Sequence, residues 1–264
     1  MNFSIHQASN IGNRRFNQDR AAYAYTKDAL LLVLADGMGG HLNGEVAAGL
    51  TIDTFTESFG SQALPRIDDP QDFIATTMRH AHERIMSLEY KGDMGSFPGT
   101  TCVAVLVQDG VAYSGHAGDS RLYVLRDGAV VAKTRDHSIV QIWFDQGVLT
   151  AEQAHGHPQR NQITNCLGGI GDVFRVEHGA PIALQPGDVL LLGSDGLWWP
   201  FSDEELAGAF VSRPVREVLD GLIERALKRV SGHSDNVTGI AVRWGGAEEA
   251  HDTDEPVCRT LEIA

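Results

Sequence analysis

Two apolar runs that each end near an aspartate-glycine pair constrain the fold most strongly. Residues 29–35 are all apolar and precede Asp36-Gly37, and residues 189–192 are apolar and precede Gly193-Ser194-Asp195-Gly196. A short uninterrupted run of this kind is typical of a strand buried on both faces. A carboxylate beside such a strand is costly unless a partner neutralises it. Each run therefore predicts a central strand with a charged group at its end.

Turn signals elsewhere predict an antiparallel sheet. Asp109-Gly110 and Asp127-Gly128 each lie between two apolar runs, which is the pattern of a tight hairpin turn. Thr150-x-x-Gln153 and Ser202-x-x-Glu205 are capping boxes, which predict the starts of two short helices. Strands are predicted over residues 29–35, 102–108, 111–115, 121–126, 129–133, 189–192 and 239–243.

Three apolar stripes at helical spacing predict longer helices. They run from Ala48 to Phe59, from Ile74 to Leu88 and from Val215 to Ala226. Because hairpins and amphipathic helices occur in separate blocks, the predicted class is α+β and not a βαβ repeat.

The chain reads as one domain over residues 1–244, followed by an acidic tail. Residues 245–264 hold six acidic residues and one arginine, so we expect a disordered or loosely docked tail there. Residues 136–165 lack a clear sheet pattern.

Composition excludes several classes of function. The 264 residues include 21 basic and 35 acidic side chains, a net charge of −14, which argues against nucleic-acid binding. Apolar runs of up to seven residues are too short to span a bilayer, so no membrane association is expected. Three cysteines are too few for a disulfide framework, and a cytoplasmic protein is the simplest reading.

Aspartates gather next to predicted strand ends. Asp19, Asp36, Asp119, Asp195 and Asp235 all lie beside such ends, with few basic residues nearby. Such a set of oxygen ligands favours Mg²⁺ or Mn²⁺ over zinc. Taken singly, Asp36 or Asp195 could instead cap a helix N-terminus, which requires no ligand.

Six short motifs in order resemble one enzyme family. They are Arg14-x-x-Asn17-Gln18-Asp19, Asp36-Gly37-Met38-Gly39-Gly40, Gly99-Thr100-Thr101, Gly118-Asp119-Ser120-Arg121, Ser194-Asp195-Gly196-Leu197-Trp198 and Asp235-Asn236. Over residues 5–243 the chain resembles the bacterial branch of the PP2C-type (PPM family) serine/threonine protein phosphatases. The resemblance implies an αββα sandwich, in which helix pairs flank two antiparallel sheets, with a metal cluster at one edge.

The resemblance also implies roles for the aspartates. Asp36 would bridge two metal ions, and the carbonyl of Gly37 would bind one of them. Asp195 and Asp235 would bind the other ion. Asp19 would support a metal-bound water from outside the coordination shell.

A third ion and the substrate phosphate complete the implied site. Asp119, together with Asp195, would hold a third, weaker ion. Arg14 would bind the phosphate through its planar guanidinium, so Arg14, Asp36 and Asp195 are the predicted catalytic residues. In the family, a water that bridges two Mn²⁺ or Mg²⁺ ions attacks phosphoserine or phosphothreonine directly, without a phosphoenzyme.

The resemblance extends to partners. It implies phosphorylated protein substrates and a cognate Hanks-type serine/threonine kinase, and residues 136–165 would form a flap beside the site. His155 and His157 in that segment lack a third ligand for zinc and are read as flap surface. Nothing in the sequence resembles a dimerisation helix, so a monomer is expected.

Two departures from the family keep alternatives open. Gln18 stands where many members have glutamate, and Met38 stands where eukaryotic members have a histidine proposed as general acid. His41 is near in sequence, but is more simply a solvent-facing residue. The alternatives are a catalytically silent phosphoprotein-binding scaffold of the same fold and an unrelated metal-dependent hydrolase.

Overall fold

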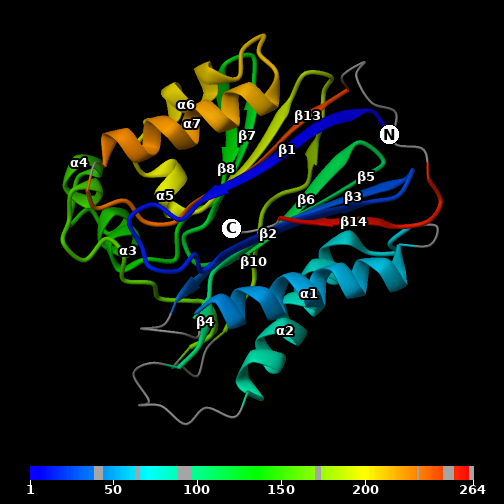
Figure 1. Ribbon diagram of the computed structural model, residues 1–264, viewed down its shortest axis with the longest axis horizontal. Coiled ribbons are helices and arrows are strands. Elements are labelled where there is room, and N and C mark those ends of the chain that lie inside the picture. Colours follow the sequence, from blue (N-terminus) through cyan, green and yellow to red (C-terminus); the bar gives the residue numbers. More distant parts are fainter. Residues whose placement is uncertain are drawn as a thin grey trace.

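The computed structural model describes residues 1–38, 44–63, 66–88, 97–169, 174–230, 232–245 and 253–261. Two antiparallel sheets pack face to face, and helices cover the outer face of each (Figure 1). One hydrophobic core lies between the two sheets. A second core lies between the larger sheet and its helices, and a third lies between the smaller sheet and its helices. This four-layer αββα arrangement is the sandwich that the sequence resemblance implies.

The smaller sheet has five strands. Their order is β1 (Phe3–Asn10), β13 (Val237–Trp244), β12 (Val189–Gly193), β7 (Arg121–Arg126) and β8 (Ala129–Lys133). Its outer face is covered by α5 (Asp195–Trp198), α6 (Asp203–Ala209) and α7 (Val215–Arg229).

The larger sheet has a main path of six strands. Their order is β10 (Glu177–His178), β6 (Val111–Ala117), β5 (Cys102–Gln108), β3 (Ala29–Met38), β2 (Asp19–Tyr25) and β14 (Val257–Thr260). Three short strands join this path, namely β11 (Ile182–Ala183), β4 (Gly99–Thr100) and β9 (Leu167–Gly168). The covering helices are α1 (Gly44–Gln62) and α2 (Pro70–Met86) (Figure 1).

Strand β3 is apolar because both of its faces are buried. Leu30, Leu32 and Leu34 point into the core between the sheets, whereas Leu31 and Val33 point toward α1 and α2. In a strand successive side chains alternate between faces, so burial of both faces removes the usual polar alternation. The strand therefore places Asp36 at the edge of the core.

The predicted turns and capping boxes are confirmed. Asp109 and Gly110, between β5 and β6, both have positive φ, at 54° and 71°, as do Asp127 at 50° and Gly128 at 79°. Two consecutive positive φ angles define the turn that suits the twist of a hairpin. Both capping boxes form, at the starts of α4 (Ala151–His155) and α6. The stripes correspond to α1, α2 and α7.

Of the two alternatives for the tail, disorder is wrong for residues 257–260, which dock on the larger sheet. These residues form β14, which pairs antiparallel with the edge of β2 from Val257–Tyr25 to Thr260–Ala22. An uncovered edge strand offers unpaired backbone groups, and β14 satisfies them despite the acidic composition around it. Leu261 also packs against the core between the sheets. The remaining tail residues 246–252 and 262–264 lie outside the described residues.

Residues 136–165 hold α3 (Ile139–Asp145), α4 and an isolated bridge between Ser138 and Ile163. None of the described helices has the length and the hydropathy needed to cross a membrane.

Candidate active site

The tertiary structure gathers the predicted aspartates around one cavity. Asp36 follows the apolar part of β3, and Asp19 is the first residue of β2. The two residues lie opposite each other in the antiparallel pairing of β2 with β3. Asp119 follows β6, Asp195 follows β12, and Asp235 precedes β13. A cavity of about 800 Å³ is lined by Asp36, Asp119, Asp195 and Asp235. Asp19 is fully buried behind it.

Helix capping does not explain these aspartates. The N-cap of α5 is Ser194, so Asp195 is the first residue inside that helix. Asp36 lies within β3. The capping alternative is therefore wrong at both positions.

The carboxylates disfavour one another's charge. Burial raises the pKa of Asp195 to about 7, and the charges of Asp235 and Asp19 add to the effect. Burial also raises the pKa of Asp36 well above its usual value, and Asp19, Asp195, Asp119 and Asp235 raise it further. Without a cation, the cluster would keep some of its protons at neutral pH.

Asp119 and Asp19 extend the same electrostatic pattern. Burial raises the pKa of Asp19 to about 6, although Thr238 and Ser194 partly oppose this by hydrogen bonding. Ser194 Oγ donates to Asp19 Oδ2 at 2.9 Å. Burial, followed by the charge of Asp195, raises the pKa of Asp119.

Two buried carboxylate oxygens in this cluster have no hydrogen-bond partner among the described residues. They are Oδ1 of Asp19 and Oδ1 of Asp195. A buried polar atom without a partner costs free energy, and a bound ion or its water would satisfy it. The residues present therefore fit a hard divalent cation held by oxygen ligands.

Gly37 is required by close packing. A Cβ atom at this position would lie 2.3 Å from the carbonyl oxygen of Gly44 and 2.7 Å from that of Gln18. Gly37 also lines the cavity, as the predicted ligand role of its carbonyl needs. Gly39, Gly40 and His41, which were named from the sequence, lie outside the described residues.

Arg14 lines the cavity on the side of Asp235. Its Nη2 donates to Asp235 Oδ2 at 2.6 Å, and 57% of its side chain is exposed. The structure thus places Arg14, the predicted phosphate-binding residue, in contact with Asp235, one of the predicted metal ligands.

The two departures from the family also line the cavity. Gln18 Nε2 donates to Oε2 of Glu45, in the first turn of α1, at 3.3 Å. The amide at position 18 is thus held by a neighbouring carboxylate. Met38 contributes a thioether, which has no proton to donate.

A histidine cluster beside the site was not identified from the sequence. Nitrogen or oxygen atoms of His116, His137 and Glu177 lie within 4.8 Å of one another. The two imidazole rings are stacked, with centroids 4.6 Å apart and planes 13° from parallel. Lone pairs in nearly parallel, stacked ring planes cannot converge on one ion, so we read the cluster as a hydrogen-bond network. In the sequence, the one signal for this cluster was the short run Asp136-His137-Ser138 at the start of residues 136–165.

Comparison with known proteins identifies relatives of this chain. The family model "Protein phosphatase 2C" matches residues 6–230. The serine/threonine protein phosphatase PstP of Mycobacterium tuberculosis is 39% identical over 240 residues, which are 88% of this chain and 43% of that protein. This chain thus spans less than half the length of PstP.

Solved structures share the whole sandwich. A serine/threonine phosphatase of S. agalactiae aligns with a TM-score of 0.82 and 30% identity, covering 92% of this chain and 99% of that one. The catalytic domain of PstP in complex with 2 manganese ions aligns with a TM-score of 0.74 and 32% identity, covering 91% and 97%. The chain therefore belongs to the protein phosphatase 2C family of serine/threonine phosphatases.

Proposed function

We propose that this protein hydrolyses phosphoserine and phosphothreonine in phosphorylated proteins and that the reaction depends on divalent metal ions. One observation carries the proposal: Asp36, Asp119, Asp195 and Asp235, from four separate segments, line one cavity together with Arg14. Family membership favours a phosphatase over a catalytically silent scaffold.

The proposed metal ligands are all oxygen atoms. Asp36, Asp195, Asp235 and the carbonyl of Gly37 would hold two ions, and Asp119 with Asp195 would hold a third, weaker one. Such a donor set suits Mn²⁺ or Mg²⁺, and the two manganese ions of the related PstP domain support Mn²⁺. When bound, these ions supply charge neutralisation and a water that is nucleophilic at neutral pH.

The protein side chains bind and orient the phosphate. Arg14 would leave Asp235 and donate two parallel hydrogen bonds to the non-bridging phosphate oxygens. Asp19, whose Oδ1 has no hydrogen-bond partner in the described part of the chain, would accept a hydrogen bond from water near Asp36. Because Met38 cannot donate a proton, the leaving alkoxide would take its proton from water in the cavity.

Hydrolysis of p-nitrophenyl phosphate and of a phosphothreonine peptide, with Mn²⁺, Mg²⁺ or EDTA, tests the proposal. We expect turnover with metal only, and a loss of at least about 100-fold in kcat for Asp36→Asn and Asp195→Asn. Asp127→Asn is the matched control, because asparagine suits the hairpin turn at that position. A folded wild-type protein without turnover in any metal would favour the silent scaffold.

The physiological partner is proposed to be a Hanks-type serine/threonine kinase whose phosphorylation this protein reverses, as a monomer in the cytoplasm. The family's activity on phosphorylated proteins supports the substrate class. Loss of phosphate from an autophosphorylated kinase domain, measured with Mn²⁺ and with EDTA, tests this partner. Light scattering, which measures the molar mass of the protein in solution, tests whether it is a monomer.

A further inference from the structure

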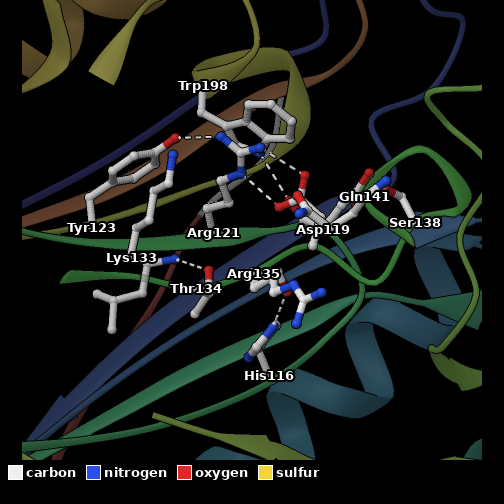
Figure 2. Close-up of polar contacts among 12 residues, drawn as sticks. His116, Asp119, Arg121, Tyr123, Lys133, Thr134, Arg135, Ser138, Gln141 and Trp198 are labelled. Carbon is white, nitrogen blue, oxygen red and sulfur yellow. Dashed lines mark hydrogen bonds and ion pairs between the residues drawn. The ribbon is translucent and has the colours of Figure 1, made fainter. Parts of the chain in front are cut away.

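The loop that carries Asp119 is held on both sides. Gly118, directly before it, donates its N–H to Nδ1 of His137 at 3.1 Å and accepts the backbone N–H of His137 at 3.0 Å. Trp198 Nε1 donates to the carbonyl of Asp119 at 3.0 Å. Figure 2 shows Trp198 above Arg121, whose guanidinium carbon lies 3.4 Å from the ring centroid. These hydrogen bonds therefore hold the backbone on both sides of the Asp119 side chain in place.

The hydrogen bonds determine which nitrogen of His137 carries the proton. Asn165 Oδ1 accepts the backbone N–H of Arg175 at 3.1 Å, and the Asn165 amide nitrogen donates to the Arg175 carbonyl at 2.8 Å, which fixes the orientation of the amide. That nitrogen donates to His137 Nδ1 at 2.9 Å. With Gly118 N–H as a second donor to the same atom, Nδ1 must be unprotonated. The proton of the neutral ring is therefore on Nε2.

Glu177 is the acceptor for that proton. His137 Nε2 lies 3.0 Å from Glu177 Oε2. The imidazole is 4% exposed and the carboxylate is 44% exposed, so Glu177 reaches in from the surface. His116 stacks flat on the His137 ring. The Nε2 atom of His116 lies 2.8 Å from the carbonyl oxygen of Arg135 (Figure 2). The ring of His137 is thus fixed in both position and tautomer.

We propose that Glu177 and His137 are positioning residues for Asp119, the candidate ligand of the weaker third ion. Glu177 keeps the proton of His137 on Nε2, and Nδ1 can then accept the N–H of Gly118 and hold the loop. This inference rests on the proposed metal centre. A partner that orients a ligand from outside the coordination shell can change metal affinity by about 10-fold.

Two substitutions of the exposed Glu177 separate tautomer control from packing. Glu177→Gln keeps an oxygen that can accept from Nε2, whereas Glu177→Ala removes it. In Glu177→Ala we expect nitrogen NMR of the imidazole to show a mixture of tautomers. Calorimetry should show about 10-fold weaker binding of Mn²⁺ at the weakest site, with the tighter sites within about 2-fold of wild type. Glu177→Gln should match wild type in both measurements.

The Asp119→Asn background completes the test. Asp119→Asn should remove the weakest Mn²⁺ site, and adding Glu177→Ala should change neither the remaining Mn²⁺ affinities nor kcat/KM any further. A further loss in that background, equal weakening of all sites, or Glu177→Gln behaving like Glu177→Ala would each overturn the inference. So would a weakest site that Asp119→Asn leaves intact.

Failure of the metal centre itself gives a different result. If the wild-type protein bound no Mn²⁺, or if Asp36→Asn bound it as wild type does, the proposed function would be wrong. If the centre is intact but Glu177→Ala is indistinguishable from wild type, only the role of Glu177 is wrong. Thermal unfolding of each variant with EDTA establishes that the compared proteins are folded.

Discussion

The guanidinium of Arg14 and the carboxylate of Asp235 form an ion pair, with 2.6 Å between Nη2 and Oδ2. More than half of the Arg14 side chain is exposed, so the pair contributes little to stability, about 0–1 kcal/mol. Arg14 can therefore leave Asp235 at small cost when an ion or a phosphate enters the cavity.

This pair predicts opposite effects of Arg14→Ala on metal and substrate. Loss of the competing cation should tighten Mn²⁺ binding by a few-fold. Loss of the phosphate contact should lower kcat/KM by about 100-fold. Calorimetry with Mn²⁺ and steady-state kinetics with a phosphothreonine peptide measure the two effects. Weaker Mn²⁺ binding in Arg14→Ala would show that the pair instead preorganises Asp235 for the ion.

Protonation of the aspartate cluster predicts a pH dependence of the metal-free protein. Burial raises the pKa of Asp19 to about 6 and that of Asp195 to about 7, from 3.8. Between the unfolded and folded values the folded protein binds more protons, so the stability from these groups is complete at low pH. That stability is lost as the pH rises through the folded values.

Urea unfolding in EDTA checks this dependence. Between about pH 5 and pH 7.5 the free energy of unfolding should fall by on the order of a few kcal/mol. Asp195→Asn, which removes one titrating group, should flatten the slope, and Mn²⁺ should restore stability to the wild-type protein at the higher pH. A rise in stability over this interval in EDTA would contradict the raised pKa values.

Gly118→Ala should destabilise the protein by about 3 kcal/mol, from backbone strain and a steric clash together. Gly118 has φ +108°, and a Cβ atom there would lie 2.6 Å from Cβ of Thr101. Gly110→Ala is the matched control, because its φ is also positive, at +71°, but no atom of the described residues lies within 4 Å of an added Cβ. The control should cost about 1 kcal/mol. Equal costs in urea unfolding would exclude the contribution of the clash.

Gln18→Glu should make the metal-free protein less stable but increase its affinity for Mn²⁺. The substitution replaces the amide that donates to Glu45 at 3.3 Å with a second carboxylate, so two negative charges would repel each other. We expect a cost of about 1 kcal/mol in EDTA and a few-fold tighter Mn²⁺ binding, measured by urea unfolding and calorimetry. The double variant Gln18→Glu/Glu45→Gln restores one donor and one acceptor, so its EDTA stability should recover. No recovery would mean that this hydrogen bond is unimportant.

Local features were predictable from the sequence because they depend on neighbouring residues. The positive φ angles at Asp109-Gly110 follow from turn chemistry, and the capping box at Ser202 follows from two residues three positions apart. The apolar run 29–35 indicated a strand buried on both faces. The resemblance of six motifs then implied the family and the aspartates that line the cavity.

Contacts between distant segments were decided only by the tertiary structure. The partnership of Asp19 with Asp36 depends on strand register, and β14 forms because an edge of β2 is available in the folded sheet. The bond from Gly118 to His137 and the bond from His137 to Glu177 join three segments whose spacing along the chain carries no signal. Turn, strand and helix preferences act over a few residues, whereas these pairings form only when the sheets and the loops between them pack together.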